Sequence, residues 1–66
     1  MIVNIICDKE EISKKFVYDI EKINFYLTTN PQMIITLRNK KYIVISVNRN
    51  IDNYAISFNV GKIKEN

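Results

Sequence analysis

The sequence predicts a small α+β domain, a two-layer sandwich in which one helix packs on a mainly antiparallel four-stranded sheet in the order β-α-β-β-β. Its 66 residues are enough for a single domain, which we take to span 1–66. Only residues 8–30 have the apolar spacing of a long helix, whereas most of the chain after Gln32 alternates apolar and polar residues as strands do. With one helix available, we expect it to cover one face of the sheet.

The first predicted strand covers residues 2–7. Alternation along it places Val3, Ile5 and Cys7 toward the core. We expect Cys7 to be a small core residue, since free cysteine is among the most buried residue types. The alternative is a thiolate activated at a helix N-terminus, and it is disfavoured because the chain has no His to act as its base.

The helix is predicted over residues 8–30. Asp8 and Glu11 have the spacing of a capping box, and Asn30 followed by Pro31 is a plausible stop. Its buried stripe is expected to consist of Ile12, Phe16, Ile20, Ile23 and Leu27. One alternative stays open, because residues 25–29 are aromatic and β-branched and could form a strand after a shorter helix.

Three further strands are predicted at residues 33–38, 42–48 and 54–60, with turn residues at 49–53 and a frayed tail at 62–66. The expected inward residues are Met33, Ile35, Leu37, Ile43, Ile45, Val47, Tyr54, Ile56, Phe58 and Val60. Because the connections are short, these strands should form an antiparallel meander. The first strand should join it through the helix as a parallel neighbour at one edge.

The composition excludes several kinds of chemistry. One Cys and no His rule out an internal disulfide and disfavour a structural zinc site, so we expect no metal or cofactor. One Gly cannot build a glycine-rich phosphate loop, and there is no serine elbow or other catalytic motif. So small a chain also has little room for a substrate pocket. We therefore expect that the protein is not an enzyme.

Origin and charge give broader indications. Ile, Asn and Lys, which A/T-rich codons encode, supply 30 of the 66 residues, and this points to a low-GC bacterium or archaeon or to its viruses and plasmids. Residues 1–7 are apolar but too few for a signal-peptide core or a membrane span, so we expect a cytoplasmic protein. The net charge is −1 over residues 1–30 and +4 over 31–66, which makes the sheet half basic.

Two classes of function fit these observations. The favoured one is a small protein-binding module, a regulator or inhibitor of a larger protein, of the kind that phages and mobile elements use against host defence, as anti-CRISPR proteins do. The expected anchors are Tyr18 and Phe25 on the outer face of the helix, seven residues apart, and Tyr42 on the outer sheet face. The alternative interpretation is that these aromatics are surface residues without a binding role.

The alternative is a nucleic-acid-binding protein that uses the basic hairpin tip at residues 38–42. Arg38, Lys40 and Lys41 lie there beside Tyr42, and cations next to a stacking aromatic suit a nucleic-acid backbone. A homodimer through the outer sheet face is a further expectation, since that face would be partly apolar. Its expected residues are Ile2, Ile6, Ile34, Thr36, Arg38, Tyr42, Val44, Ser46, Ala55, Ser57 and Asn59.

Overall fold

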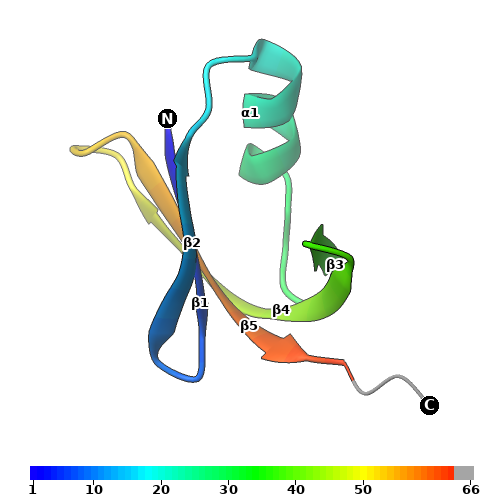
Figure 1. Ribbon diagram of the computed structural model, residues 1–66. Coiled ribbons are helices and arrows are strands. Elements are labelled where there is room, and N and C mark those ends of the chain that lie inside the picture. The colour runs from blue at the N-terminus through cyan, green and yellow to red at the C-terminus, as the bar shows by residue number, and fades with distance from the viewer. Residues whose placement is uncertain (64–66) are drawn as a thin grey trace.

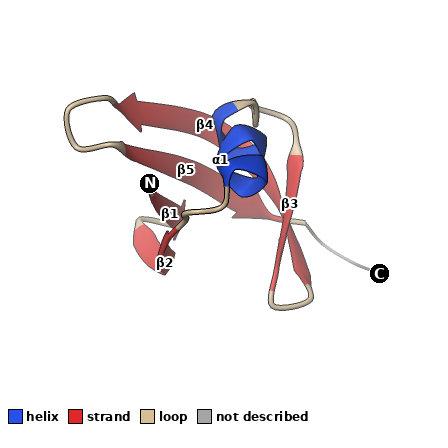
Figure 2. Cartoon of the chain, turned by 90° about the horizontal axis from the view of Figure 1, so that it is seen from above, coloured by secondary structure: helices blue, strands red, loops and turns tan. Residues whose placement is uncertain are grey.

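The computed structural model describes residues 1–63, in which five strands and one helix are present. The elements are β1 (Ile2–Cys7), β2 (Glu10–Phe16), α1 (Ile20–Leu27), β3 (Ile34–Leu37), β4 (Lys40–Asn50) and β5 (Ala55–Lys62). The strands form one curled sheet in the order β2-β1-β5-β4-β3, with α1 on its concave side (Figures 1 and 2). β1 and β5 are parallel and the other neighbours are antiparallel. The expected four-stranded sheet is therefore a five-stranded mixed one.

The additional strand is β2, which occupies the first part of the predicted helix. Asp8 and Lys9 both have positive φ angles, 52° and 68°, as the two central residues of a tight type I′ hairpin turn require. β2 then returns antiparallel to β1, from Cys7 opposite Glu10 to Ile2 opposite Phe16. The predicted capping box at Asp8 is therefore wrong. Because β2 covers the outer side of β1, β1 is an internal strand instead of an edge.

The helix is much shorter than predicted and begins at a different cap. Asp19 is the N-cap, and its Oδ1 accepts a hydrogen bond of 2.8 Å from the backbone N–H of Glu21. At the other end, the hydroxyl of Thr28 donates to the carbonyl of Asn24, and the buried Thr29 hydroxyl donates to the carbonyl of Phe25. Asn30 thus follows the helix and does not cap it. A helix of eight residues depends on tertiary packing for its stability.

Only part of the predicted helical stripe is buried. Ile23 and Tyr26 are the buried residues of α1, and the Tyr26 ring centroid lies 5.9 Å from that of Phe58 in β5. Phe16 and Ile20 are 61% and 67% exposed, so the expectation that they are core residues is wrong. Ile12 is partly buried, but it packs from β2, and Leu27 is exposed at the helix end.

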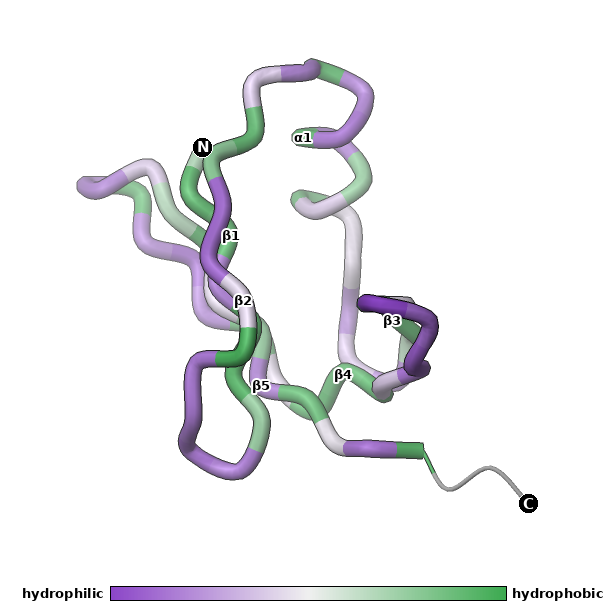
Figure 3. Tube along the Cα trace, viewed as in Figure 1, coloured by the Kyte–Doolittle hydropathy of each residue, from purple (hydrophilic) through white to green (hydrophobic). Residues whose placement is uncertain are grey.

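The core is centred on the two parallel strands. The inward positions Val3, Ile5 and Cys7 of β1 are buried as predicted. Ile56, Phe58 and Val60 of β5 are also buried as predicted. Tyr54 precedes β5 and is exposed, which contradicts the prediction for it. Hydrophilic residues gather at the three hairpin turns (Figure 3).

A β-bulge in β4 reverses the predicted facing of its first half. The register with β5 shifts between Val44 and Ser46, so that Tyr42 and Val44 point inward and are buried, while Ile45 is exposed. After the bulge Val47 packs against the core, as predicted. The sequence of this segment does not show which side chains point inward, because apolar residues occupy all positions from 42 to 45 and do not alternate with polar ones.

The last strands agree with the predicted meander. β3 pairs with β4 and β4 pairs with β5, both antiparallel. In β3, Ile35 is buried and Leu37 is partly buried, whereas Met33 lies before the strand and is exposed. Lys62 is the last residue of β5, and the N–H of Ile63 donates to the carbonyl of Lys41, so residues 62 and 63 do not form the predicted frayed tail. Residues 64–66 of that tail lie outside the described residues.

Within residues 1–63, no helix is long and apolar enough to cross a membrane.

Candidate functional site

The predicted helical anchors do not form a line on one helix. Tyr18 lies in the connection between β2 and α1 and is 83% exposed, whereas Phe25 lies on α1 and is about half exposed. The Phe25 ring packs edge-on against Tyr26 at a centroid distance of 5.2 Å. Tyr42 is buried, so it is not an anchor on the outer sheet face. Tyr18 remains accessible on its own, in a hollow that it shares with Lys15, Lys22 and Tyr26.

The basic residues predicted at a hairpin tip lie at the turn between β3 and β4. Arg38 and Asn39 form the β3–β4 turn with positive φ angles, and Lys40 and Lys41 are exposed at the start of β4. The pairing of Tyr42 with Lys62 in β5 adds a further cation. We call the hollow lined by Lys40, Lys41, Tyr42, Lys62 and Ile63 the basic hollow, and its volume is about 250 Å³.

Within residues 31–63 little negative charge lies near the basic hollow, although Asp8 and Glu10 of the β1–β2 hairpin lie at the same end of the sheet, where Cys7 pairs with Val60. Asp52 is the one acid among residues 31–63, and it lies in the β4–β5 turn. β4 runs for eleven residues from the basic hollow to that turn, so the two ends are separated by roughly 35 Å of extended chain. The cations of the basic hollow are therefore not neutralised by that carboxylate.

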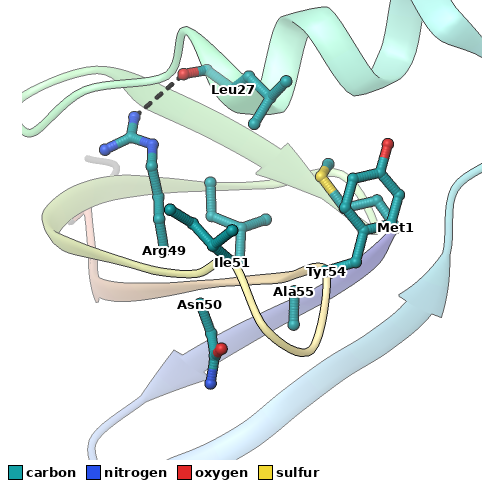
Figure 4. Close-up of a pocket in the computed structure, with 8 residues that line it drawn as sticks. Met1, Leu27, Arg49, Asn50, Ile51, Tyr54 and Ala55 are labelled. Carbon is teal, nitrogen blue, oxygen red and sulfur yellow. Dashed lines mark hydrogen bonds between the residues drawn. The ribbon is translucent and has the colours of Figure 1, made fainter.

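A second hollow, at the opposite end of the sheet, is almost entirely apolar. We call it the apolar pocket. It has a volume of about 190 Å³ and lies between the end of α1 and the β4–β5 turn (Figure 4). Its lining residues are Met1, Leu27, Arg49, Asn50, Ile51, Tyr54, Ala55 and Ile56.

Two pairs of hydrogen bonds hold the walls of the apolar pocket together. The N-terminal amine of Met1 donates to the carbonyl of Val17 at 2.9 Å, and the N–H of Val17 donates back to the carbonyl of Met1 at 2.7 Å. Arg49 Nη2 donates to the carbonyls of Leu27 and Thr29 at 3.0 and 3.3 Å, which joins the end of α1 to β4 (Figure 4). A cation is favourable at this position, because the last carbonyls of a helix carry partial negative charge.

Three large apolar side chains lie exposed at the apolar pocket. Leu27 is 44% exposed, Tyr54 59% and Ile51 89%. Tyr54 also has a φ of 49°, a left-handed conformation that is unusual for a bulky residue and that glycine would adopt at no steric cost. The turn is closed by the Tyr54 N–H, which donates to the carbonyl of Ile51, and by the Asn53 N–H, which donates to Asn50 Oδ1.

The sequence patterns do not predict this pocket. Leu27 and Tyr54 occupy inward positions in the predicted helix and strand, and Ile51 lies among turn-forming residues. One signal was present, because Ile51 is an apolar residue within a run of turn-forming Asn and Asp residues and has no inward strand position. An apolar residue at a turn is exposed unless another part of the chain covers it.

The outer face of the sheet carries a polar row. Asn4, Ser57 and Asn48 are in register on β1, β5 and β4, and the Asn4 amide nitrogen donates to the Ser57 hydroxyl at 3.4 Å. In the next row Asn59 Nδ2 donates to Ser46 Oγ at 2.9 Å. Asn4 Oδ1 is buried without a hydrogen-bond partner among the described residues. Ser46, Ser57 and Asn59 thus lie on the outer face as predicted, whereas Tyr42 and Val44 do not.

Among residues 1–63, no group of three or more His, Cys, Asp and Glu side chains could hold a metal ion. No protein-family model, curated protein or solved structure matches the chain. The candidate sites therefore rest on the geometry described above, and the apolar pocket and the basic hollow are two that gather several side chains of one chemical kind.

Proposed function

We propose that the protein is a small non-catalytic protein-binding module, a regulator or inhibitor that uses the apolar pocket to hold apolar side chains of a larger protein. The observation that carries this proposal is the exposure of Leu27, Ile51 and Tyr54 around a hollow with an almost wholly apolar lining. Apolar side chains gathered on a surface are typical of protein interfaces, and Tyr is enriched at binding hot spots.

The size of the apolar pocket supports a protein partner over a small molecule. Small-molecule sites span roughly 300–1,000 Å³, and this pocket is smaller, at about 190 Å³. An inserted side chain of a partner would contact Leu27 and Met1 as well as the exposed Ile51 and Tyr54 of the turn. The A/T-rich composition suits a phage or mobile-element protein acting against host defence, and this origin is part of the proposal.

The strained backbone at Tyr54 supports the same site. A left-handed conformation costs a residue with a side chain about 1–2 kcal/mol, and it is tolerated where the surrounding structure and a function require it. At this position the left-handed conformation is accepted by a tyrosine, whose aromatic ring lies at the mouth of the apolar pocket.

The proposal is tested by affinity capture with three baits. Wild type, Ile51→Glu and the pair Lys40→Ala with Lys41→Ala are immobilised and exposed to a nuclease-treated lysate of a low-GC host. We expect a defined protein to be retained by the wild type and by the lysine pair and to be lost with Ile51→Glu, because a charge at the rim would have to be desolvated on binding. Equal retention by all three baits would contradict the proposal.

The basic hollow supports a second candidate function, the binding of a nucleic-acid backbone. The specific observation is that Lys62 joins Lys40 and Lys41 in one hollow, away from the acid in the β4–β5 turn. Tyr42 lines that hollow but is buried, which weakens its expected role as a stacking platform. This function predicts that binding falls steeply with salt and that the lysine pair loses most of the affinity.

A further inference from the structure

One half of β4 has an edge that no other strand covers. β3 pairs with β4 from Lys40 to Ile43, and residues Met33 and Gln32 then bond to the backbone of Val44. Beyond that point, within the described residues, β4 continues to Asn50 with β5 on one side and no strand on the other (Figure 2). We call residues 46–50 the open edge of β4.

The backbone hydrogen bonds of β5 show which backbone groups of β4 face outward from this edge. The N–H of Ile2 donates to the carbonyl of Tyr54, so alternate residues of β5 from Tyr54 onward face β1, and Ala55, Ser57 and Asn59 face β4. Their partners Asn50, Asn48 and Ser46 therefore bond toward β5. The N–H and C=O groups of Val47 and Arg49, which lie between these partners, point away from the sheet.

The open edge of β4 has fewer of the devices that protect other edges, although it begins at the bulge between Val44 and Ser46. β2, at the opposite side of the sheet, carries four charged residues and a bulge, and β3 has only four residues. Such charges, bulges and short lengths prevent edge-to-edge association. Along the open edge of β4 the one charged residue is Arg49, and its guanidinium is held by the carbonyls of Leu27 and Thr29.

We propose that the open edge of β4 pairs antiparallel with the same edge of a second copy of this chain, about a two-fold axis at Asn48. This register sets Val47 opposite Arg49 of the other copy, so the outward N–H and C=O groups of both residues find partners. Ser46 stands opposite Asn50, and no two like charges face each other. The inference rests on the sheet edge and does not depend on the apolar pocket.

The outer face supports a second copy over an unrelated strand. Asn48 bonds toward β5, so in the pair it would form a position without backbone hydrogen bonds across the axis, where opposing side chains lie closest. Its amide would meet the amide of Asn48 from the other copy, and amides offer both donors and acceptors to each other. The polar row of Asn4, Ser57 and Asn48 would then continue across both sheets.

Sedimentation equilibrium over a range of concentrations tests this pairing. We expect wild type to dimerise and Asn48→Lys and Asn48→Glu each to weaken the dimer about fivefold or more, because like charges directly opposite each other are destabilising. A mixture of the two variants should restore the dimer as a heterodimer. Asn59→Lys is the matched control, since it adds the same charge to the same face on β5, one strand in from the edge and opposite Ser46 instead of at the two-fold axis, and it should leave the dimer intact.

Three outcomes would overturn the inference. They are a wild type that stays monomeric up to about 1 mM, a mixture of charge variants that does not associate, and a dimer that Asn59→Lys breaks while Asn48→Lys does not. The last result would place the contact on the sheet face. If the charge variants do not fold, amide exchange of the wild type decides, because the Val47 and Arg49 amides should gain protection with concentration and unchanged rates would refute the pairing.

Discussion

At the scale of single residues, the chain makes its tight turns without glycine. The one Gly lies in β5, and the positive φ angles of the described residues fall on Asp8, Lys9, Gln32, Arg38, Asn39 and Tyr54. Asp and Asn tolerate this conformation because their short polar side chains bond locally. The other four residues do not have this advantage, so each carries a conformational cost that glycine would remove: Lys9, Gln32, Arg38 and Tyr54.

Tyr54 is the residue at which this cost can be separated from function. Because the backbone stays left-handed, the free energy of unfolding of Tyr54→Gly should equal that of the wild type or exceed it by up to about 1 kcal/mol. Tyr54→Ala keeps the strain and should be about 1 kcal/mol less stable than Tyr54→Gly. Urea denaturation of the three proteins measures the difference. If Ala were as stable as Gly at this position, the left-handed conformation would be wrong.

At the scale of the elements, β2 shows why a helical spacing was misleading. Ile12 and Phe16 are four residues apart, which suits one face of a helix. In β2 a bulge lies at Ile12, so that Ile12 packs against the core and Phe16 is exposed. The usual hairpin signal of Asn-Gly or Asp-Gly was absent, since Asp8 is followed by Lys9. Without glycine at its turn, the sequence of the hairpin has the pattern of a helix N-terminus, with acids in the first turn.

Lys9→Gly distinguishes the hairpin from the predicted helix. At a φ of 68°, glycine should relieve strain and raise the free energy of unfolding by up to about 1 kcal/mol. In a helix the same change would be neutral or destabilising, because glycine is a poor helix former. Lys14→Gly is the control, since it lies within β2 and should lower the stability by up to about 1 kcal/mol. Thermal melts of both variants decide between the two structures.

At the scale of the whole molecule, sequence patterns predicted what is local in the chain. They predicted the inward faces of β1 and β5 and the basic tip, because each depends on residues within one strand or turn. They missed the apolar pocket, which joins residues from three separate parts of the chain: Met1 at the N-terminus, Leu27 at the end of α1, and Ile51 and Tyr54 in the β4–β5 turn. They also missed the facing of β4, where the bulge decides and no polar residue marks it.

The core arrangement makes a matched prediction for two phenylalanines. Phe58 is fully buried at the centre of the sheet, and Phe16 is exposed at the end of β2. Phe58→Leu should lower the free energy of unfolding by about 1–2 kcal/mol, a large fraction of the total for so small a domain. Phe16→Leu should stay within about 0.5 kcal/mol of wild type. Chemical denaturation of both measures this, and equal losses would mean that both rings are buried.

The central claim is that the protein binds another protein through the apolar pocket, and the affinity of the captured partner tests it most directly. Isothermal titration at two salt concentrations compares wild type with Ile51→Ala, Tyr54→Ala and the pair Lys40→Ala with Lys41→Ala. We expect a loss of about tenfold or more for at least one pocket variant, because truncating an anchor costs about 2 kcal/mol. The lysine pair should have a small effect that salt removes. Affinity that falls steeply with salt and is lost mainly in the lysine pair would contradict the claim and support the nucleic-acid function.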